Sequence, residues 1–162
     1  MKIGLFILIG IVLGYIVKWI VNWLAIDNFI MSRKNFFLEA VGAIMVTWSA
    51  VNLGIEEAII FSIIALTLAG ISVIDFHTFE IPLIFIIIGV VASIAGIFLK
   101  VILLSSAFWG IFVGALIPMA IMLILWGITK RQGMGYGDIQ LGIVLGAWLG
   151  PMRMALTLFG AS

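Results

Sequence analysis

Two acidic residues lie in short polar stretches between long apolar runs of this sequence. Asp75 begins the stretch D-F-H-T-F-E, and Asp138 follows the glycine-rich stretch G-M-G-Y-G. Glycine occupies little space, so the second stretch allows the backbone to turn sharply or to approach a partner closely. A carboxylate beside a membrane segment is unfavourable unless it has a partner or a function. Two such acids have the chemistry for general acid and base catalysis on a shared substrate.

The composition indicates a membrane protein. Of the 162 residues, 65% are hydrophobic and 9% are charged, whereas soluble domains have about a quarter of their residues charged. The net charge of +1 gives no reason to expect nucleic acid as a partner. The sequence has no cysteine, which excludes disulfides, cysteine-based zinc sites and a thiol nucleophile.

The apolar runs have the length of membrane spans, roughly 20 residues each. They predict an all-α fold: a polytopic transmembrane bundle of about six spanning helices in a single membrane domain, residues 1–162, with the lipid bilayer as its surroundings. Pro82 is expected at the first position of its helix, where a missing N–H leaves no hydrogen bond unmade. The predicted helices cover residues 3–26, 36–54, 58–74, 81–99, 107–128 and 138–158.

Glycines at four-residue spacing predict close packing between helices, because a helix face without side chains lets a second backbone approach. They form a pair in the first predicted helix, a pair in the fifth and a stripe in the sixth. These glycines are Gly10 and Gly14, Gly110 and Gly114, and Gly142, Gly146 and Gly150.

Counting of spans places Asp75 and Asp138 on the same side of the membrane. If all six segments span, the loops after the first, third and fifth share one side. The paired basic residues of those loops, together with Lys18, which we expect to extend to the nearer interface, favour that side as cytoplasmic. The N-terminus then lies on the opposite side. The basic residues are Arg33, Lys34, Lys130 and Arg131 on the first side, and Lys2, Lys100 and Arg153 on the other.

Two carboxylates at one membrane boundary can hydrolyse a peptide bond without a covalent intermediate. If they face each other they cannot both ionise readily, so we expect the pair to share a proton near neutral pH. The ionised acid then takes a proton from water while the protonated acid polarises the scissile carbonyl. This chemistry needs no cofactor. A metal held by Asp75, His77, Glu80 and Asp138 is the less favoured alternative, since His77 is the only histidine.

The two motifs resemble those of the type IV prepilin peptidases, which are polytopic aspartic proteases of the GxGD class. The first family motif is an Asp followed six residues later by an aliphatic residue and Pro, to which Asp75, Ile81 and Pro82 are similar. The second is G-x-G-D, to which Gly135, Tyr136, Gly137 and Asp138 are similar. The resemblance extends over nearly the whole chain.

The resemblance implies that Asp75 and Asp138 are the catalytic residues. It implies an aspartic endopeptidase of the bacterial inner membrane, multi-pass, with its active site facing the cytoplasm. The implied substrates are prepilins and pseudopilins of type IV pili, type II secretion or competence systems. Their short basic leaders are cut after a Gly, just before a long hydrophobic helix.

Three features depart from the family pattern. Residues 27–35 stand where the family often has a cysteine-rich loop, which leaves open whether this chain also N-methylates the new terminus with S-adenosylmethionine. Gln140 stands where a basic residue usually follows the second Asp. Members commonly have one or two further helices, so we expect a chain truncated at its C-terminus, a partial chain or a smaller bundle.

Four further residues are candidate contacts of the site. Glu39 resembles an acid that the family carries at the start of its second helix, and would either bond within the bundle or help to capture substrate. We expect His77 and Glu80 to be solvated loop residues near the site rather than direct participants. Tyr136, between the motif glycines, is expected to pack against the substrate.

Two alternative interpretations involve the same acids. Asp138 alone would be the N-cap of the sixth helix, a role compatible with catalysis. A proton- or cation-coupled transporter would use Asp75 and Asp138 as a relay or as ligands. Transport predicts acids near the middle of the membrane, whereas both acids fall at the ends of their segments, and this position favours the peptidase.

Overall fold

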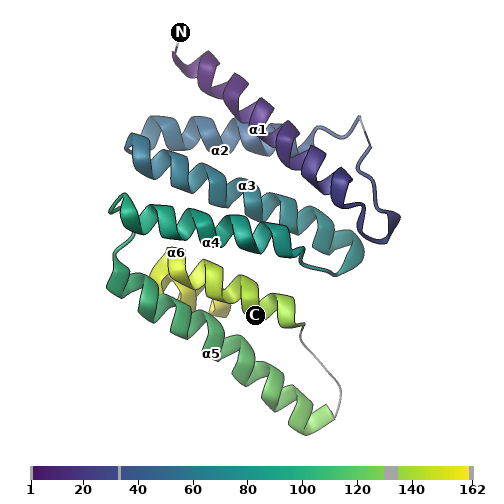
Figure 1. Cartoon of the computed structure of the whole chain (residues 1–162), viewed down its shortest axis with the longest axis vertical. Coiled ribbons are helices and arrows are strands. Elements are labelled where there is room, and N and C mark those ends of the chain that lie inside the picture. Colours follow the sequence, from purple (N-terminus) through teal and green to yellow (C-terminus); the bar gives the residue numbers. More distant parts are fainter. Residues whose placement is uncertain (1, 33, 130–134, 161–162) are drawn as a thin grey trace. The chain divides into compact units, whose positions relative to one another are not determined.

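The computed structural model describes residues 2–32, 34–129 and 135–160. Over this part the chain is all-α, as predicted, with six α-helices and one short 3-10 helix (Figure 1). The elements are α1 (Lys2–Leu24), η1 (Ile26–Asn28), α2 (Phe37–Asn52), α3 (Ile55–Thr78), α4 (Leu83–Phe98), α5 (Leu104–Thr129) and α6 (Tyr136–Gly160).

Four of these helices are long and apolar enough to cross a membrane, which makes this a multi-pass membrane protein. The helices α2 and α4 have 16 residues each, or about 24 Å at 1.5 Å per residue, against a hydrocarbon core of about 30 Å. The prediction of six helices is therefore confirmed, and that of a membrane span is supported for four. The four spans are Ile3–Leu24, Ile55–Thr78, Leu104–Ile128 and Tyr136–Thr157.

The helices form two compact units, which are described separately. The first unit, Met1–Ile88, contains α1, η1, α2, α3 and the start of α4. In it α1, α2 and α3 pack on one another. The second unit, Gly89–Ser162, contains the rest of α4 together with α5 and α6, which pack along each other.

Glycines bring α1 and α2 into backbone contact. A β-carbon at Gly10 would collide with the backbone of Gly42, and one at Gly14 would collide with the backbone of Leu38. The collision is reciprocal, because a β-carbon at Gly42 would meet the Gly10 carbonyl oxygen. The predicted role of Gly10 and Gly14 in close helix packing is therefore confirmed.

The second unit uses the same device between α5 and α6. A β-carbon at Gly110 would collide with the Gly146 carbonyl, and one at Gly114 with the Gly142 carbonyl. The reverse substitutions would meet the carbonyls of Gly110 and Gly114. The two glycine sets predicted for these helices are thus confirmed as two faces of one contact.

The last helix is interrupted, whereas the sequence predicts a continuous helix over residues 138–158. Gly150 has φ 75° and ψ 174°, which are not helical values, and Pro151 follows it. Proline cannot donate the backbone hydrogen bond that a continuous helix requires, and glycine tolerates the positive φ at the break. A side chain at Gly150 would in addition collide with the Ser106 hydroxyl.

Alanine at Gly10 is expected to destabilise the first unit by about 1–3 kcal/mol, the usual effect of overpacking. The added carbon would overlap backbone atoms of α2, which cannot rotate away as a side chain can. Gly4→Ala is the matched control in the same helix, because its β-carbon meets nothing within 4 Å. Thermal unfolding of the detergent-solubilised protein measures both. Equal midpoints for the two variants would contradict the packing described here.

The third helix ends later than predicted, at Thr78 rather than at residue 74. Its last side chains bond back to the helix: the Thr78 hydroxyl donates to the Ile74 carbonyl at 3.0 Å. Phe79 then terminates the helix in the left-handed conformation, φ 55° and ψ 30°, and its N–H donates to the Asp75 carbonyl at 2.9 Å. Asp75 therefore lies in the last turn of α3 and not in a loop.

The remaining helix ends differ from the prediction by one to three residues, and for two of them the backbone shows the cause. The first helix ends at Leu24 because Ala25 and Asp27 both have positive φ, 40° and 50°. The fourth helix begins at Leu83, so Pro82 precedes its first residue instead of occupying it. The Pro82 carbonyl still accepts the N–H of Phe85 at 3.1 Å, which makes this proline the cap of α4.

Candidate active site

Asp75 lies at the end of a membrane-length helix with its side chain exposed. Its backbone carbonyl accepts the hydrogen bond that ends α3. Ser72 lies one turn earlier, at the i,i+3 spacing that places two side chains next to each other on a helix. The carboxylate of Asp75 is thus held on a rigid element and is open to a substrate.

Asp138 lies in the first turn of α6 and its side chain is half-buried. Its carboxylate oxygen Oδ2 accepts the N–H of Gly135 at 3.0 Å, and its own N–H donates to the Gly135 carbonyl at 3.2 Å. Asp138 is the third residue of the helix, so Gly135 takes the N-cap position that the sequence alone would assign to Asp138. The bond between the Asp138 carboxylate and the Gly135 N–H is the one that the third helix residue makes to the N-cap residue in a capping box. It holds the acid at the positive end of the helix dipole.

Other residues of the glycine-rich stretch surround this cap. Tyr136 is the first residue of α6 and is 69% exposed, and Gly137 follows it. A β-carbon at Gly135 would make only an ordinary contact with Asp138 Oδ2, at 3.6 Å. Among the described residues, a side chain at position 135 would therefore meet nothing closer than ordinary van der Waals contact. Gly133 and Met134 lie outside the described residues.

The two acids belong to different units, Asp75 to the first and Asp138 to the second. Each is in a terminal turn of a helix long enough to span a membrane. This agrees with the expectation that both fall at segment ends. Their pairing across the two units stays a prediction.

His77 lies in the last turn of α3, whereas the sequence predicts that it is a loop residue. Two contacts hold its side chain. Its Nδ1 lies 2.9 Å from the Val73 carbonyl oxygen. Its ring stacks on Phe29, with centroids 4.1 Å apart and planes at 25°. Glu80 follows the end of the helix and is exposed, as predicted.

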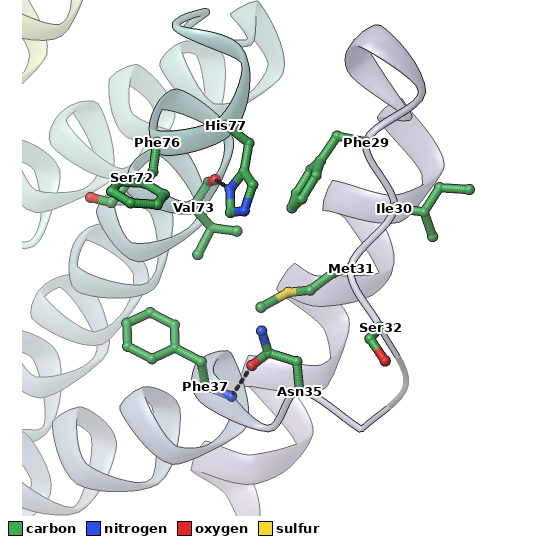
Figure 2. Close-up of a pocket in the computed structure, with 10 residues that line it drawn as sticks. All are labelled: Phe29, Ile30, Met31, Ser32, Asn35, Phe37, Ser72, Val73, Phe76 and His77. Atoms are coloured by element: carbon green, nitrogen blue, oxygen red, sulfur yellow. Dashed lines mark hydrogen bonds between the residues drawn. The ribbon is translucent and has the colours of Figure 1, made fainter.

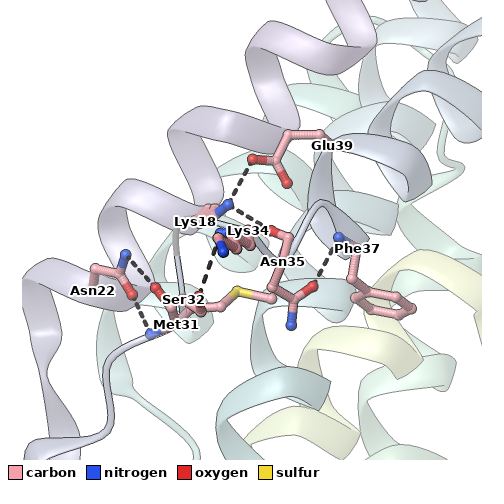
Figure 3. A network of polar contacts seen from close by, with 8 residues as sticks. All are labelled: Lys18, Asn22, Met31, Ser32, Lys34, Asn35, Phe37 and Glu39. Atoms are coloured by element: carbon pink, nitrogen blue, oxygen red, sulfur yellow. Dashed lines mark hydrogen bonds and ion pairs between the residues drawn. The ribbon is translucent and has the colours of Figure 1, made fainter.

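Glu39 forms a buried ion pair with Lys18 (Figure 3). The two residues are 6% and 5% exposed, and Lys18 Nζ lies 2.9 Å from Glu39 Oε1. The prediction that Lys18 extends to the interface is therefore wrong, because the acid on the neighbouring helix keeps the ammonium inside the unit. Glu39 Oε2 has no hydrogen-bond partner in the part of the chain that the structure describes.

Polar side chains also fasten the segment between α1 and α2 (Figure 3). Lys18 Nζ donates to the Asn35 carbonyl at 2.5 Å. The Asn22 amide bonds both backbone groups of Met31: its Oδ1 accepts the N–H at 2.7 Å, and its Nδ2 donates to the carbonyl at 3.4 Å. The roles of Asn22 and Asn35 were not predicted from the sequence. The four-residue spacing of Lys18 and Asn22 within an apolar run was the signal for a polar stripe.

A cavity of about 500 Å³ lies between this segment and the end of α3 (Figure 2). One wall comes from the chain between α1 and α2 together with the first residue of α2, and the other from the last turns of α3. The lining residues are Phe29, Ile30, Met31, Ser32, Asn35, Phe37, Ser72, Val73, Phe76 and His77.

The fold and the site define a class of protein: a helical, multi-pass membrane protein with an acid in the terminal turn of each of two span-length helices, one of them capped through Gly-x-Gly-Asp. The chain belongs to the type IV leader peptidase family, whose family profile matches residues 59–162. That match covers more than half of the chain and includes Asp75 and Asp138.

Two curated relatives agree with this assignment. The chain is 35% identical over 75 residues to a prepilin leader peptidase/N-methyltransferase of Stutzerimonas stutzeri. It is 33% identical over 75 residues to a protein of the same name from Dichelobacter nodosus. In both cases the aligned part is 46% of this chain and 25% of the relative, so the chain spans about a quarter of their length. No solved structure matches the chain significantly.

Proposed function

We propose that this chain is an aspartic endopeptidase that removes the short basic leader of prepilins or pseudopilins. The observation that carries the proposal is the family match over residues 59–162, which contains both motif acids. The positions of the acids in terminal helix turns support it, because a cut beside a hydrophobic helix takes place at the boundary of the membrane. Family membership favours this function over a proton- or cation-coupled transporter.

In the proposed mechanism Asp75 and Asp138 act as one acid and one base. The ionised carboxylate takes a proton from a water molecule as its oxygen attacks the scissile carbonyl carbon. The protonated carboxylic acid donates its proton to the carbonyl oxygen, which gives a neutral tetrahedral intermediate. Collapse of this intermediate breaks the C–N bond, and a proton passes to the leaving amine. No cofactor takes part in these steps.

The proposed location is the bacterial inner membrane, with the site at the cytoplasmic boundary and the N-terminus on the opposite side. S-Adenosylmethionine is required only if this chain also methylates the new terminus, an activity that the names of both relatives include. The cysteine-rich loop of the family, in whose place residues 27–35 stand, would then be dispensable for methylation. Transfer of label from S-adenosylmethionine to the cleaved product tests this part separately.

Reconstitution with a prepilin tests the proposal directly. The full chain and a full-length prepilin are placed in lipid vesicles, and leader removal is followed by the fall in mass and by the sequence of the new N-terminus. We expect cleavage at the junction of the leader and the hydrophobic segment. Ion flux through the same vesicles without any cleavage would instead support the transporter.

A further inference from the structure

The cavity beside the end of α3 has the size and position of a substrate subsite. Its volume of about 500 Å³ falls within the roughly 300–1,000 Å³ that is typical of ligand sites. Its α3 wall consists of Ser72, Val73, Phe76 and His77, each three residues or fewer from Asp75 in the sequence. A molecule bound here therefore lies within about one helical turn of the proposed catalytic acid.

The lining determines which part of a substrate fits. Six of the ten lining residues are apolar, and the described lining includes no Lys, Arg, Asp or Glu. A basic leader would meet no carboxylate among the described lining residues to balance its charge. Aromatic and aliphatic walls suit an uncharged segment instead. The aromatic residues of this lining are Phe29, Phe37 and Phe76.

Two hydrogen-bonding groups on opposite walls suit a peptide backbone. Asn35 Oδ1 is occupied, because it accepts the Phe37 N–H at 3.0 Å. Its Nδ2 donors have no partner among the described residues and point toward the cavity in Figure 2. On the other wall His77 Nδ1 contacts the Val73 carbonyl. A carbonyl can only accept, so Nδ1 carries the hydrogen and Nε2 of the neutral ring is an acceptor.

An extended peptide offers the complement of this pair. Within each peptide group of an extended strand the carbonyl and the N–H point to opposite edges, so one edge can accept from Asn35 while the other donates to His77. The loop wall is already fixed before binding, by the bonds from Asn22 to Met31 and from Lys18 to Asn35. A preformed wall loses little freedom when a substrate binds, which favours affinity.

We propose that this cavity holds an uncharged, extended segment of the substrate next to the scissile bond, while the basic leader lies outside it. This inference rests on the proposed function. It adds that Asn35 and His77 bind the substrate backbone and that the aromatic residues of the cavity receive its apolar side chains. Asn35 and His77 are thereby binding residues, whereas Asn22 and Lys18 position the wall.

Photo-crosslinking tests the occupant of the cavity without requiring cleavage. The full chain carries Asp75→Asn, so that the prepilin stays intact, and p-benzoylphenylalanine replaces Phe37 or Phe76. Phe36 is the control position: it neighbours Phe37 in the sequence, is 66% exposed and is not part of this lining. After irradiation in lipid vesicles we expect adducts from positions 37 and 76 but not from 36. Mass spectrometry should place them on uncharged residues beside the cleavage site.

Kinetics of Asn35→Asp give a second readout in the otherwise unchanged chain. Aspartate keeps the oxygen that accepts the Phe37 N–H but replaces the donor that faces the cavity. We expect KM for the prepilin to rise about tenfold, the equivalent of one lost hydrogen bond, with a smaller change in kcat. Asn52→Asp is the control, because Asn52 lies exposed at the other end of α2. Its KM is expected to stay unchanged.

The outcomes separate this inference from the proposed function. If the parent chain cleaves the prepilin but positions 37 and 76 give no adducts, the subsite is wrong and the peptidase stands. Adducts from position 36, or on the basic leader alone, would likewise overturn the subsite, as would an unchanged KM for Asn35→Asp. If the parent chain cleaves no prepilin, the proposed function fails and the subsite fails with it.

Discussion

Asp75→Asn and Asp138→Asn should each lower prepilin cleavage by about 10²- to 10⁴-fold, the usual contribution of general acid–base catalysis. Asparagine has nearly the shape of aspartate, but it neither ionises nor carries a transferable carboxyl proton. The proposed mechanism needs one acid in each protonation state, so replacing either acid removes a complete proton-transfer step. The rate of leader removal, measured with purified chain and prepilin in lipid vesicles, gives the effect directly.

The choice of asparagine separates catalysis from structure at Asp138. Its oxygen Oδ2 accepts the Gly135 N–H at 3.0 Å, and an asparagine oxygen can accept the same bond. The start of α6 is therefore expected to survive in Asp138→Asn, and only the chemistry should be lost. If Asp138 were a cap alone, Asp138→Asn would cleave normally.

Glu57→Gln is the control for both variants. Glu57 is an exposed acid in the first turn of α3, at the opposite end of the helix from Asp75. Removing its charge changes the net charge of the chain as much as either test variant does. We expect its cleavage rate to match that of the parent chain. Unimpaired cleavage by Asp75→Asn or Asp138→Asn would contradict the two-acid mechanism.

The buried ion pair should give the largest change in stability. Lys18→Met or Glu39→Gln alone is expected to lower the free energy of unfolding by about 3–5 kcal/mol, because each leaves one charge buried without its partner. Both residues are at least nine-tenths buried, and their charged atoms lie 2.9 Å apart. Water therefore does little to screen the charge that is left.

The double variant makes this a test of the pair and not of the single side chains. Lys18→Met combined with Glu39→Gln removes both charges, so we expect it to recover most of the stability lost in either single variant. Lys34→Met is the control for loss of a basic residue, since Lys34 is exposed, and should change stability by less than about 0.5 kcal/mol. Denaturant titration of the detergent-solubilised chain measures all four variants. Additive losses in the double variant would contradict a direct ion pair.

The ion pair also connects stability with the proposed subsite. Lys18 Nζ bonds both Glu39 and the backbone carbonyl of Asn35. Loss of the lysine should therefore loosen the segment that carries one wall of the cavity. The glycine contact of α1 with α2, at Gly10 and Gly14, holds the same two helices together. The helices α1 and α2, which support this wall, are thus held together by one polar contact, the ion pair, and one apolar contact, between the glycines and the facing backbone.

Several features could be predicted because they depend on local sequence. The length and hydrophobicity of each run determine a membrane helix, since an apolar segment of that length has no other stable way to satisfy its backbone in lipid. The four-residue spacing of glycines predicts a helix contact because such residues share one face. Both acids were located at helix ends for the same reason: polar residues interrupt the apolar runs there.

Other features were decided by contacts between segments that are far apart in the sequence. Whether Lys18 reaches the interface or pairs with Glu39 depends on which faces of α1 and α2 meet, and the pattern of one helix does not contain that information. The extension of α3 through His77 likewise accompanies the stacking of its ring on Phe29, which the segment after α1 supplies. The end of that helix therefore could not be placed from the sequence of α3 alone.

The sequence by itself determined that this is an all-α membrane protein, which glycines let its helices touch, and which two acids carry the motifs of the type IV leader peptidase family. These properties follow from composition and from spacing along one helix. Only the tertiary structure decided that Lys18 is buried against Glu39 and that a preformed cavity adjoins the turn of Asp75. Those properties arise from side chains of separate segments, whose meeting depends on how the helices pack.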